Sequence, residues 1–204
     1  MKALSALLEI SARDHSHLCP RQILGARIGL RGICSLQLEP NQNSKQLLVI
    51  TETDGCFADG LSAATNCTIG HRTLRVEDYG KVAATFVDTQ TGKAVRVAPV
   101  VDIRRKACIH APDEPSQYFA QMTAYQNMPD DEMMTAHEVD LNTPIEQIIS
   151  HPGMRVNCDV CGEEIMNERE VRKNRLTLCH TCACGGYYQS AQDSVLRTPN
   201  LMAL

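Results

Sequence analysis

Two Cys-x-x-Cys motifs near the C-terminal end constrain this chain more than any other feature. The four cysteines are Cys158, Cys161, Cys179 and Cys182, with seventeen residues between the two pairs. Four thiolates at this spacing can surround one zinc ion tetrahedrally. Gly162 follows the first pair, where a tight knuckle turn needs a permissive backbone. We therefore predict a structural zinc finger of the treble-clef or ribbon type, with a hairpin within 163–178 and a short helix opened by the second pair.

The charges of the finger bear on nucleic-acid binding. Arg169, Arg172, Lys173 and Arg175 form a small basic cluster. Glutamates are interspersed with them, the whole chain has a formal net charge of −4, and it contains no Trp for base stacking. A solvated face or a protein-docking surface therefore fits this cluster better than a nucleic-acid interface.

Length and composition predict a soluble protein of two unequal domains. The chain has 204 residues, of which 43% are hydrophobic and 22% charged. Neither a signal peptide nor an apolar run of membrane-spanning length is evident, so the ten cysteines predict a reducing, cytoplasmic location. A breaker cluster at 151–153 divides the chain into a core domain, 1–152, and a finger domain with a C-terminal tail, 153–204.

Hydrophobic periodicity predicts an α+β core. The expected helices are 2–12, 20–34, 56–65, 115–127 and 144–150, and the expected strands are 45–53, 72–78, 81–88, 93–101 and 135–141. We interpret Arg104-Arg105-Lys106 as a solvated turn. The methionines between 122 and 134 are expected to fill the core, as are Cys34 and Cys67.

A second group of metal-ligand residues lies in the N-terminal part. Cys19 precedes Pro20, which suits the first position of a helix, so Cys19 is the expected N-cap. Asp54 is the expected cap of the helix that begins near Cys56. A helix N-terminus lowers the pKa of a thiol, so we expect both cysteines to be reactive.

Histidines complete this N-terminal group. Cys19, Cys56 and an imidazole from His17 or His15 would give three protein ligands and an open fourth position, which is typical of a catalytic or exchangeable metal site. The alternative is a histidine that is merely structural.

Several motifs in order resemble the FmdE-like family, which takes its name from formylmethanofuran dehydrogenase. The residues are His15-Ser-His17-Leu-Cys19-Pro20, Thr51-Glu52-Thr53-Asp54-Gly55-Cys56-Phe-Ala-Asp59, Cys67-Thr68-Ile69-Gly70 and Asp78-Tyr79-Gly80-Lys81. The resemblance implies a thioredoxin-like core with a mixed sheet flanked by helices. It also implies an active site at His17, Cys19 and Cys56, with His15 as an addition, that holds zinc in some members. Asp54, Asp59 and Lys81 match family positions nearby.

Three functions follow as hypotheses. The first is a zinc-binding accessory protein with one structural zinc and a second zinc in the N-terminal domain, whose partner is a molybdenum formylmethanofuran dehydrogenase or a related redox enzyme. The second is a metal- or thiol-dependent enzyme acting at the His17, Cys19 and Cys56 cluster. The third is a nucleic-acid-binding regulator. We also expect a homodimer and no association with a membrane.

Overall fold

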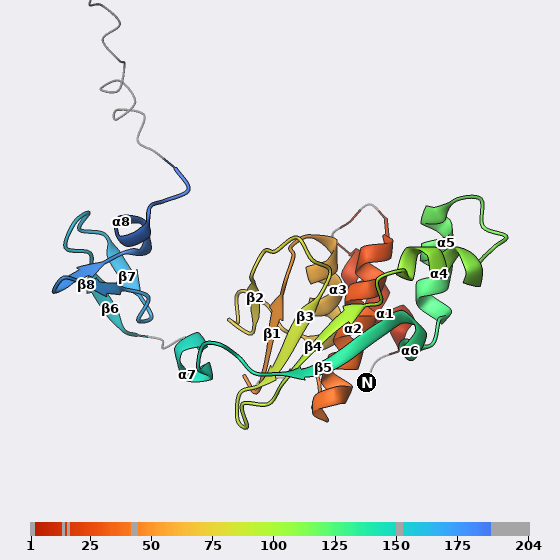
Figure 1. Ribbon diagram of the computed structural model, residues 1–204, viewed down its shortest axis with the longest axis horizontal. Helices are drawn as coiled ribbons and strands as arrows, with labels where there is room; N and C mark the ends of the chain where they lie inside the picture. Colours follow the sequence, from red (N-terminus) through yellow and green to blue (C-terminus); the bar gives the residue numbers. More distant parts are fainter. Residues whose placement is uncertain (1–2, 14, 16, 42–44, 150–152, 189–204) are drawn as a thin grey trace, which may run out of the picture. The chain divides into compact units, whose positions relative to one another are not determined.

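The computed structural model describes residues 3–13, 15, 17–41, 45–149 and 153–188, and the chain divides into two compact units, 1–145 and 146–204 (Figure 1). The breaker cluster that we expect to separate the domains falls largely on residues 150–152, which lie outside the described residues. The domain boundary after residue 152 therefore stays a prediction.

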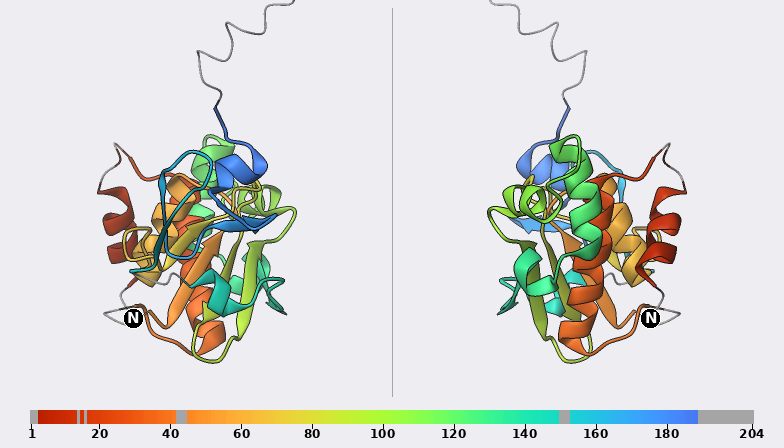
Figure 2. Two further views of the ribbon diagram at one scale, coloured as in Figure 1. Left: turned by 90° about the vertical axis from the view of Figure 1, so that its left-hand side faces the viewer. Right: turned by 90° about the vertical axis from the view of Figure 1, so that its right-hand side faces the viewer.

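The first unit is a five-stranded mixed sheet with helices beside it (Figures 1 and 2). The strand order is β2-β1-β3-β4-β5, with β1 and β2 parallel and the other neighbours antiparallel. The predicted α+β class with a mixed sheet is confirmed. The strands are β1 (Leu47–Thr51), β2 (Leu74–Val76), β3 (Ala84–Asp88), β4 (Ala94–Pro99) and β5 (Met134–Val139). The helices are α1 (Leu4–Ala12), α2 (Pro20–Leu36), α3 (Cys56–Thr65), α4 (Ile103–His110), α5 (Gln117–Asn127), α6 (Asp130–Met133) and α7 (Ile145–Ile148), the last of which spans the division between the units.

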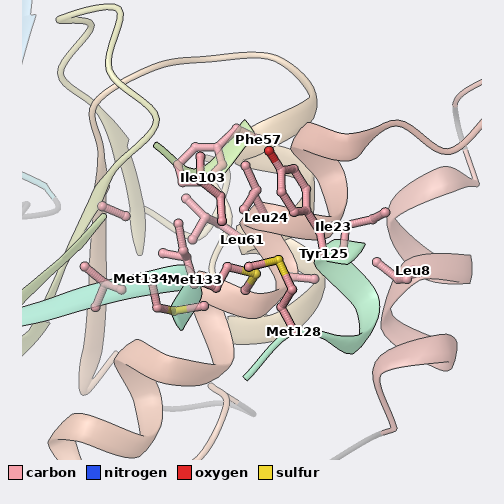
Figure 3. Close-up of a cluster of buried hydrophobic side chains, with 14 of the residues drawn as sticks. Leu8, Ile23, Leu24, Phe57, Leu61, Ile103, Tyr125, Met128, Met133 and Met134 are labelled. Atoms are coloured by element: carbon pink, nitrogen blue, oxygen red, sulfur yellow. The ribbon is translucent and has the colours of Figure 1, made fainter. Parts of the chain in front are cut away.

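The core lies between the helices and one face of the sheet. Val49, Phe86 and Val95 are aligned across β1, β3 and β4 and are buried. The ring of Phe86 fits against Gly32 of α2, where a Cβ atom would collide with it. Figure 3 shows the neighbouring part of this core, with Phe57, Leu61 and Tyr125 from the helices.

Sulfur-containing residues contribute to this core as predicted, with one exception. Met128, Met133 and Met134 are buried in it (Figure 3), and Cys67 is fully buried. Cys34 is exposed, so its prediction as a core residue is wrong. The reason is helical phase: α2 turns Ile33 inward and Cys34 outward.

Helices α2 and α3 pack unusually closely because glycines replace side chains at their contact. A Cβ atom on Gly25 would collide with the carbonyl oxygen of Phe57, and one on Gly60 would lie 2.8 Å from the amide nitrogen of Ala26. Further along, Gly29 contacts Ala64. The paired positions increase together in both helices, so the helices run parallel and begin at the same end. Cys19 and Cys56, at the two helix starts, are thereby brought together.

The solvated turn predicted at Arg104-Arg105-Lys106 is wrong, because these residues lie in α4. Its buried side chains are Ile103 and Ala107, one helical turn apart. A single apolar pair on an otherwise charged segment is too weak a periodic signal to identify a helix from the sequence.

The second unit is a small finger. It contains β6 (Arg155–Asn157) paired with β7 (Glu164–Met166), β8 (Val171–Lys173) paired with β9 (Leu176–Leu178), and α8 (His180–Cys184). Asn174 and Arg175 turn between β8 and β9 with φ of +52° and +66°, the left-handed values of a tight hairpin. The predicted hairpin within 163–178 and the helix at the second cysteine pair are confirmed.

None of the helices in the part of the chain that the structure describes has both the length and the apolar character needed to cross a membrane.

We predict that Gly25→Ala destabilises the first unit, because the added methyl group meets the backbone of α3, which cannot move aside alone. Overpacking of this kind costs about 2–3 kcal/mol, partly offset by the higher helix propensity of Ala, about 1 kcal/mol. Urea unfolding followed by circular dichroism measures the effect. Gly70→Ala is the control, because a Cβ atom there meets nothing within 4 Å. Equal midpoints for the two variants would contradict the close packing.

Candidate functional site

The four cysteines of the finger form one cluster. Their sulfur atoms all lie within 4.8 Å of one another, and they are the one group of three or more potential metal ligands at this spacing among the described residues. The Sγ atoms of Cys161 and Cys179 are 3.8 Å apart. A tetrahedron with zinc–sulfur bonds of about 2.3 Å has an edge of about 3.8 Å. The donor set and this separation therefore fit a four-thiolate metal ion.

Local backbone geometry places each cysteine pair. In the first, the amide of Gly162 donates to the carbonyl of Cys158 at 2.9 Å, and Gly162 has a φ of +75° that favours glycine. In the second, Cys179 is the N-cap of α8, and its sulfur accepts a hydrogen bond from the amide of Cys182 at 3.4 Å. The amide of Cys179 donates to the sulfur of Cys158 at 3.2 Å and links the pairs.

These amides shape the electrostatics of the cluster. The amides of Cys161 and Cys179 donate to the sulfur of Cys158 and lower its pKa to about 6. The pKa of Cys182 is raised to about 12, first by a hydrogen bond with the Cys179 side chain and then by burial. Four sulfurs held this closely cannot all ionise without a cation between them, which is the situation that a bound metal relieves.

The basic cluster of the finger is partly neutralised. Arg172 pairs with Glu170 at 3.2 Å, and Arg155 pairs with Glu164 at 3.1 Å on the first hairpin. These pairs offset part of the positive charge that the third hypothesis requires.

Cys19 lies where α2 begins, as predicted. Its amide donates to Oε1 of Gln22 at 2.8 Å, and Nε2 of Gln22 donates to the carbonyl of Ser11 in α1 at 2.8 Å. The hydroxyl of Tyr118, in α5, donates to the carbonyl of Leu18 at 3.2 Å. The segment that carries Cys19 is therefore held from α1, α2 and α5.

Cys56 is the first residue of α3. The predicted Asp54 cap is wrong, since the N-cap is Gly55 and it makes no side-chain cap bond. Gly55 has φ +67° and ψ −151°, a region essentially restricted to glycine. This conformation turns the chain sharply from the end of β1 into the helix and leaves Asp54 out of reach of the first turn.

The connection before Cys56 is anchored to the sheet. Glu52 accepts two hydrogen bonds from the guanidinium of Arg96 in β4, at 2.5 and 2.8 Å. The Glu52 side chain is 12% exposed and that of Arg96 is 35% exposed. The amides of Tyr79 and Lys81 donate to the Glu52 carbonyl at 3.0 and 3.1 Å. The Asp78-Tyr79-Gly80-Lys81 motif thus supports the connection that delivers Cys56.

The two N-terminal cysteines influence each other. Burial raises the pKa of Cys56, and so do a hydrogen bond with the Cys19 side chain and the charge of Cys19, while Arg21 lowers it. The prediction of a lowered thiol pKa is therefore wrong for Cys56. The effect of the helix start is outweighed because the second helix start brings another thiol against the first.

The histidines are placed differently from one another. His15 Nε2 lies 2.9 Å from Oδ2 of Asp59, in the first turn of α3. His17 is exposed. Within the described residues, neither imidazole joins Cys19 and Cys56 in a group of ligand atoms all within 4.8 Å. The N-terminal metal site stays a prediction, and its thiol pair is the part that the structure assembles.

Asp59 matches a family position, but the sequence alone assigns it no role. Its spacing from Cys56, three residues on a helix, is the available signal, because positions i and i+3 share a helix face.

Comparison with known proteins identifies a family. A family model described as "FmdE, Molybdenum formylmethanofuran dehydrogenase operon" matches residues 15–152. The crystal structure of an FmdE-like protein of a tungsten formylmethanofuran dehydrogenase from Syntrophus aciditrophicus superposes with a TM-score of 0.61 and 21% identity, over 92% of this chain and 96% of that one. That similarity shows a shared fold.

A curated protein of Archaeoglobus fulgidus, described as a "Probable S-adenosyl-L-methionine-binding protein", is 35% identical over 97 residues. The match spans 46% of this chain but only 26% of that protein.

We predict that Glu52→Ala lowers the free energy of unfolding by about 1–3 kcal/mol, because it removes two charge-assisted hydrogen bonds and leaves Arg96 half-buried without its carboxylate. Asp102→Ala is the control. It removes an exposed ion pair with Arg105, 2.7 Å long, and should leave the unfolding midpoint unchanged. The two midpoints in urea decide the matter, and a larger loss in the control would refute the anchoring role.

Proposed function

The chain belongs to the FmdE family, and on this premise we propose that it is a zinc-binding accessory protein with two sites of different kinds. The finger holds a structural zinc at Cys158, Cys161, Cys179 and Cys182. The N-terminal unit holds an exchangeable zinc at Cys19 and Cys56 with an imidazole from His17 or His15. The observation that carries the proposal is the clustering of four cysteine sulfurs within 4.8 Å, together with the contact between the Cys19 and Cys56 side chains.

The finger is suited to a metal with a structural role. Its buried cluster consists of Cys158, Ile165 and Leu178, too small a core to support a unit of this size without a staple. Zinc fits because a closed set of four thiolates satisfies its tetrahedral preference and leaves no position for a substrate.

The N-terminal site is suited to exchange. Cys19 and Cys56 are both partly exposed and lie on two rigid helix starts. Two soft donors on a rigid frame, with the imidazoles on the connection before α2, leave room for an external ligand on the metal. Zinc bound there would supply a Lewis acid.

The family description supplies the class of partner. We propose that the chain docks on, or helps to mature, a molybdenum formylmethanofuran dehydrogenase or a related redox enzyme, and that it acts in the cytoplasm as a homodimer with a thioredoxin-like core. The paired charges of the finger suit contact with another protein better than contact with a nucleic acid.

The alternative function is an enzyme acting at His17, Cys19 and Cys56. In its thiol form, Cys19 and Cys56 lose two protons and two electrons to form one disulfide, while a disulfide substrate gains them and becomes two thiols. The contact between the two side chains favours this alternative. It differs from the metal function because it needs neither histidine.

We predict close to two zinc ions per chain for the wild type purified under reducing conditions, measured by mass spectrometry of the metal. Cys158→Ser should lose the finger zinc, and Cys56→Ser should lose the N-terminal one, because each removes a thiolate ligand. Cys34→Ser is the control, since that exposed cysteine belongs to neither cluster. A wild type with one zinc, lost only in Cys158→Ser, would refute the N-terminal zinc and favour the dithiol function.

A further inference from the structure

The contact between His15 and Asp59 joins two parts of the N-terminal unit that are 44 positions apart in the sequence, with His15 Nε2 lying 2.9 Å from Asp59 Oδ2. The imidazole is 32% exposed and the carboxylate 47% exposed. An ion pair this accessible adds little to stability. Its physical consequence is to fix the orientation of the imidazole.

That orientation is relevant to the thiols. Asp59 follows Cys56 by three residues in the first turn of α3, and residues three apart share a helix face. The backbone of His15 is held as well, because its amide donates to the carbonyl of Ala12 at the end of α1 at 3.0 Å. His15 is therefore fixed at both ends, on the face of α3 that carries Cys56.

The chemistry of the pair determines which imidazole nitrogen is available. An ionised carboxylate can only accept hydrogen bonds, so Nε2 of His15 must carry the proton that it donates to Asp59. In the neutral imidazole, Nδ1 then holds the lone pair. Histidines that bind metals are commonly oriented in this way by a carboxylate on the other nitrogen.

We propose that Asp59 is a positioning residue for His15: it holds the Nε2–H tautomer and leaves Nδ1 as the nitrogen that binds a metal at the Cys19 and Cys56 thiols. This inference rests on the proposed function, since it makes His15, rather than the exposed His17, the third protein donor. Asp59 itself does not touch the metal.

The first test needs no metal. The ring nitrogens of His15 are observed by ¹⁵N nuclear magnetic resonance in the full chain, with His15→Ala used to assign them. The wild type should show a protonated Nε2 and an unprotonated Nδ1 above the range in which the ring is charged. Asp59→Ala should give a mixture of tautomers, and Asp59→Asn should keep the wild-type tautomer because its amide oxygen still accepts. An unchanged tautomer in Asp59→Ala would overturn the proposal.

The second test measures cobalt affinity at the N-terminal site after the finger has been loaded with zinc. Asp59→Ala should weaken binding by about 10–100-fold, the usual effect of removing a carboxylate that orients a metal-binding histidine. Asp59→Asn should recover most of this loss. Asp113→Ala, which removes an exposed carboxylate elsewhere in the same unit, is the control.

A double-mutant cycle separates positioning from a general loss of charge. In a His15→Ala background, Asp59→Ala should change cobalt affinity by no more than about twofold, since its target is gone. An equal loss in both backgrounds would overturn the proposal. If the wild type binds no cobalt at all, the proposed function fails at this site, and the tautomer measurement alone decides the role of Asp59.

Discussion

The close contact between α2 and α3 is the constraint on which the N-terminal site depends. Gly25 and Gly60 let the two backbones approach where any side chain would hold them apart. The helices run parallel, so their N-termini meet at one end, and Cys19 and Cys56 stand at those two ends. Removing the contact would not merely loosen the core. It would separate the two thiols, which no local interaction within either segment could bring back together.

The two cysteine clusters illustrate opposite ways of placing sulfur atoms. In the finger, hydrogen bonds within each knuckle set the local geometry, and little apolar core surrounds it. The metal would have to stabilise that unit. In the first unit, a full hydrophobic core positions Cys19 and Cys56 without any metal. A metal is therefore a structural requirement for the finger and at most a guest at the helix starts, which suits one site to stability and the other to exchange.

This contrast explains what the sequence can predict. The four finger cysteines lie within a short stretch, so spacing alone identifies them, and the hairpin and helix between them follow. The pairing of Cys19 with Cys56 needs a resemblance to a family, because helix packing decides it. The predicted thiol pKa of Cys56 is wrong for the same reason, since it considers each helix without the other. Helix α4 escapes prediction because only Ile103 and Ala107 face the core.

The arrangement also separates the two chemical interpretations of the N-terminal site. The cysteines are fixed by helix starts, and Glu52 and Arg96 tie the connection before Cys56 to the sheet. The histidines come from the connection between α1 and α2, and His15 reaches the site through Asp59. A dithiol that cycles with a disulfide would need only the rigid part. A metal site would need both parts, so the pairing of His15 with the helix that carries Cys56 favours the metal. An imidazole held by a carboxylate beside two thiols has an evident use as a ligand and none in simple disulfide exchange.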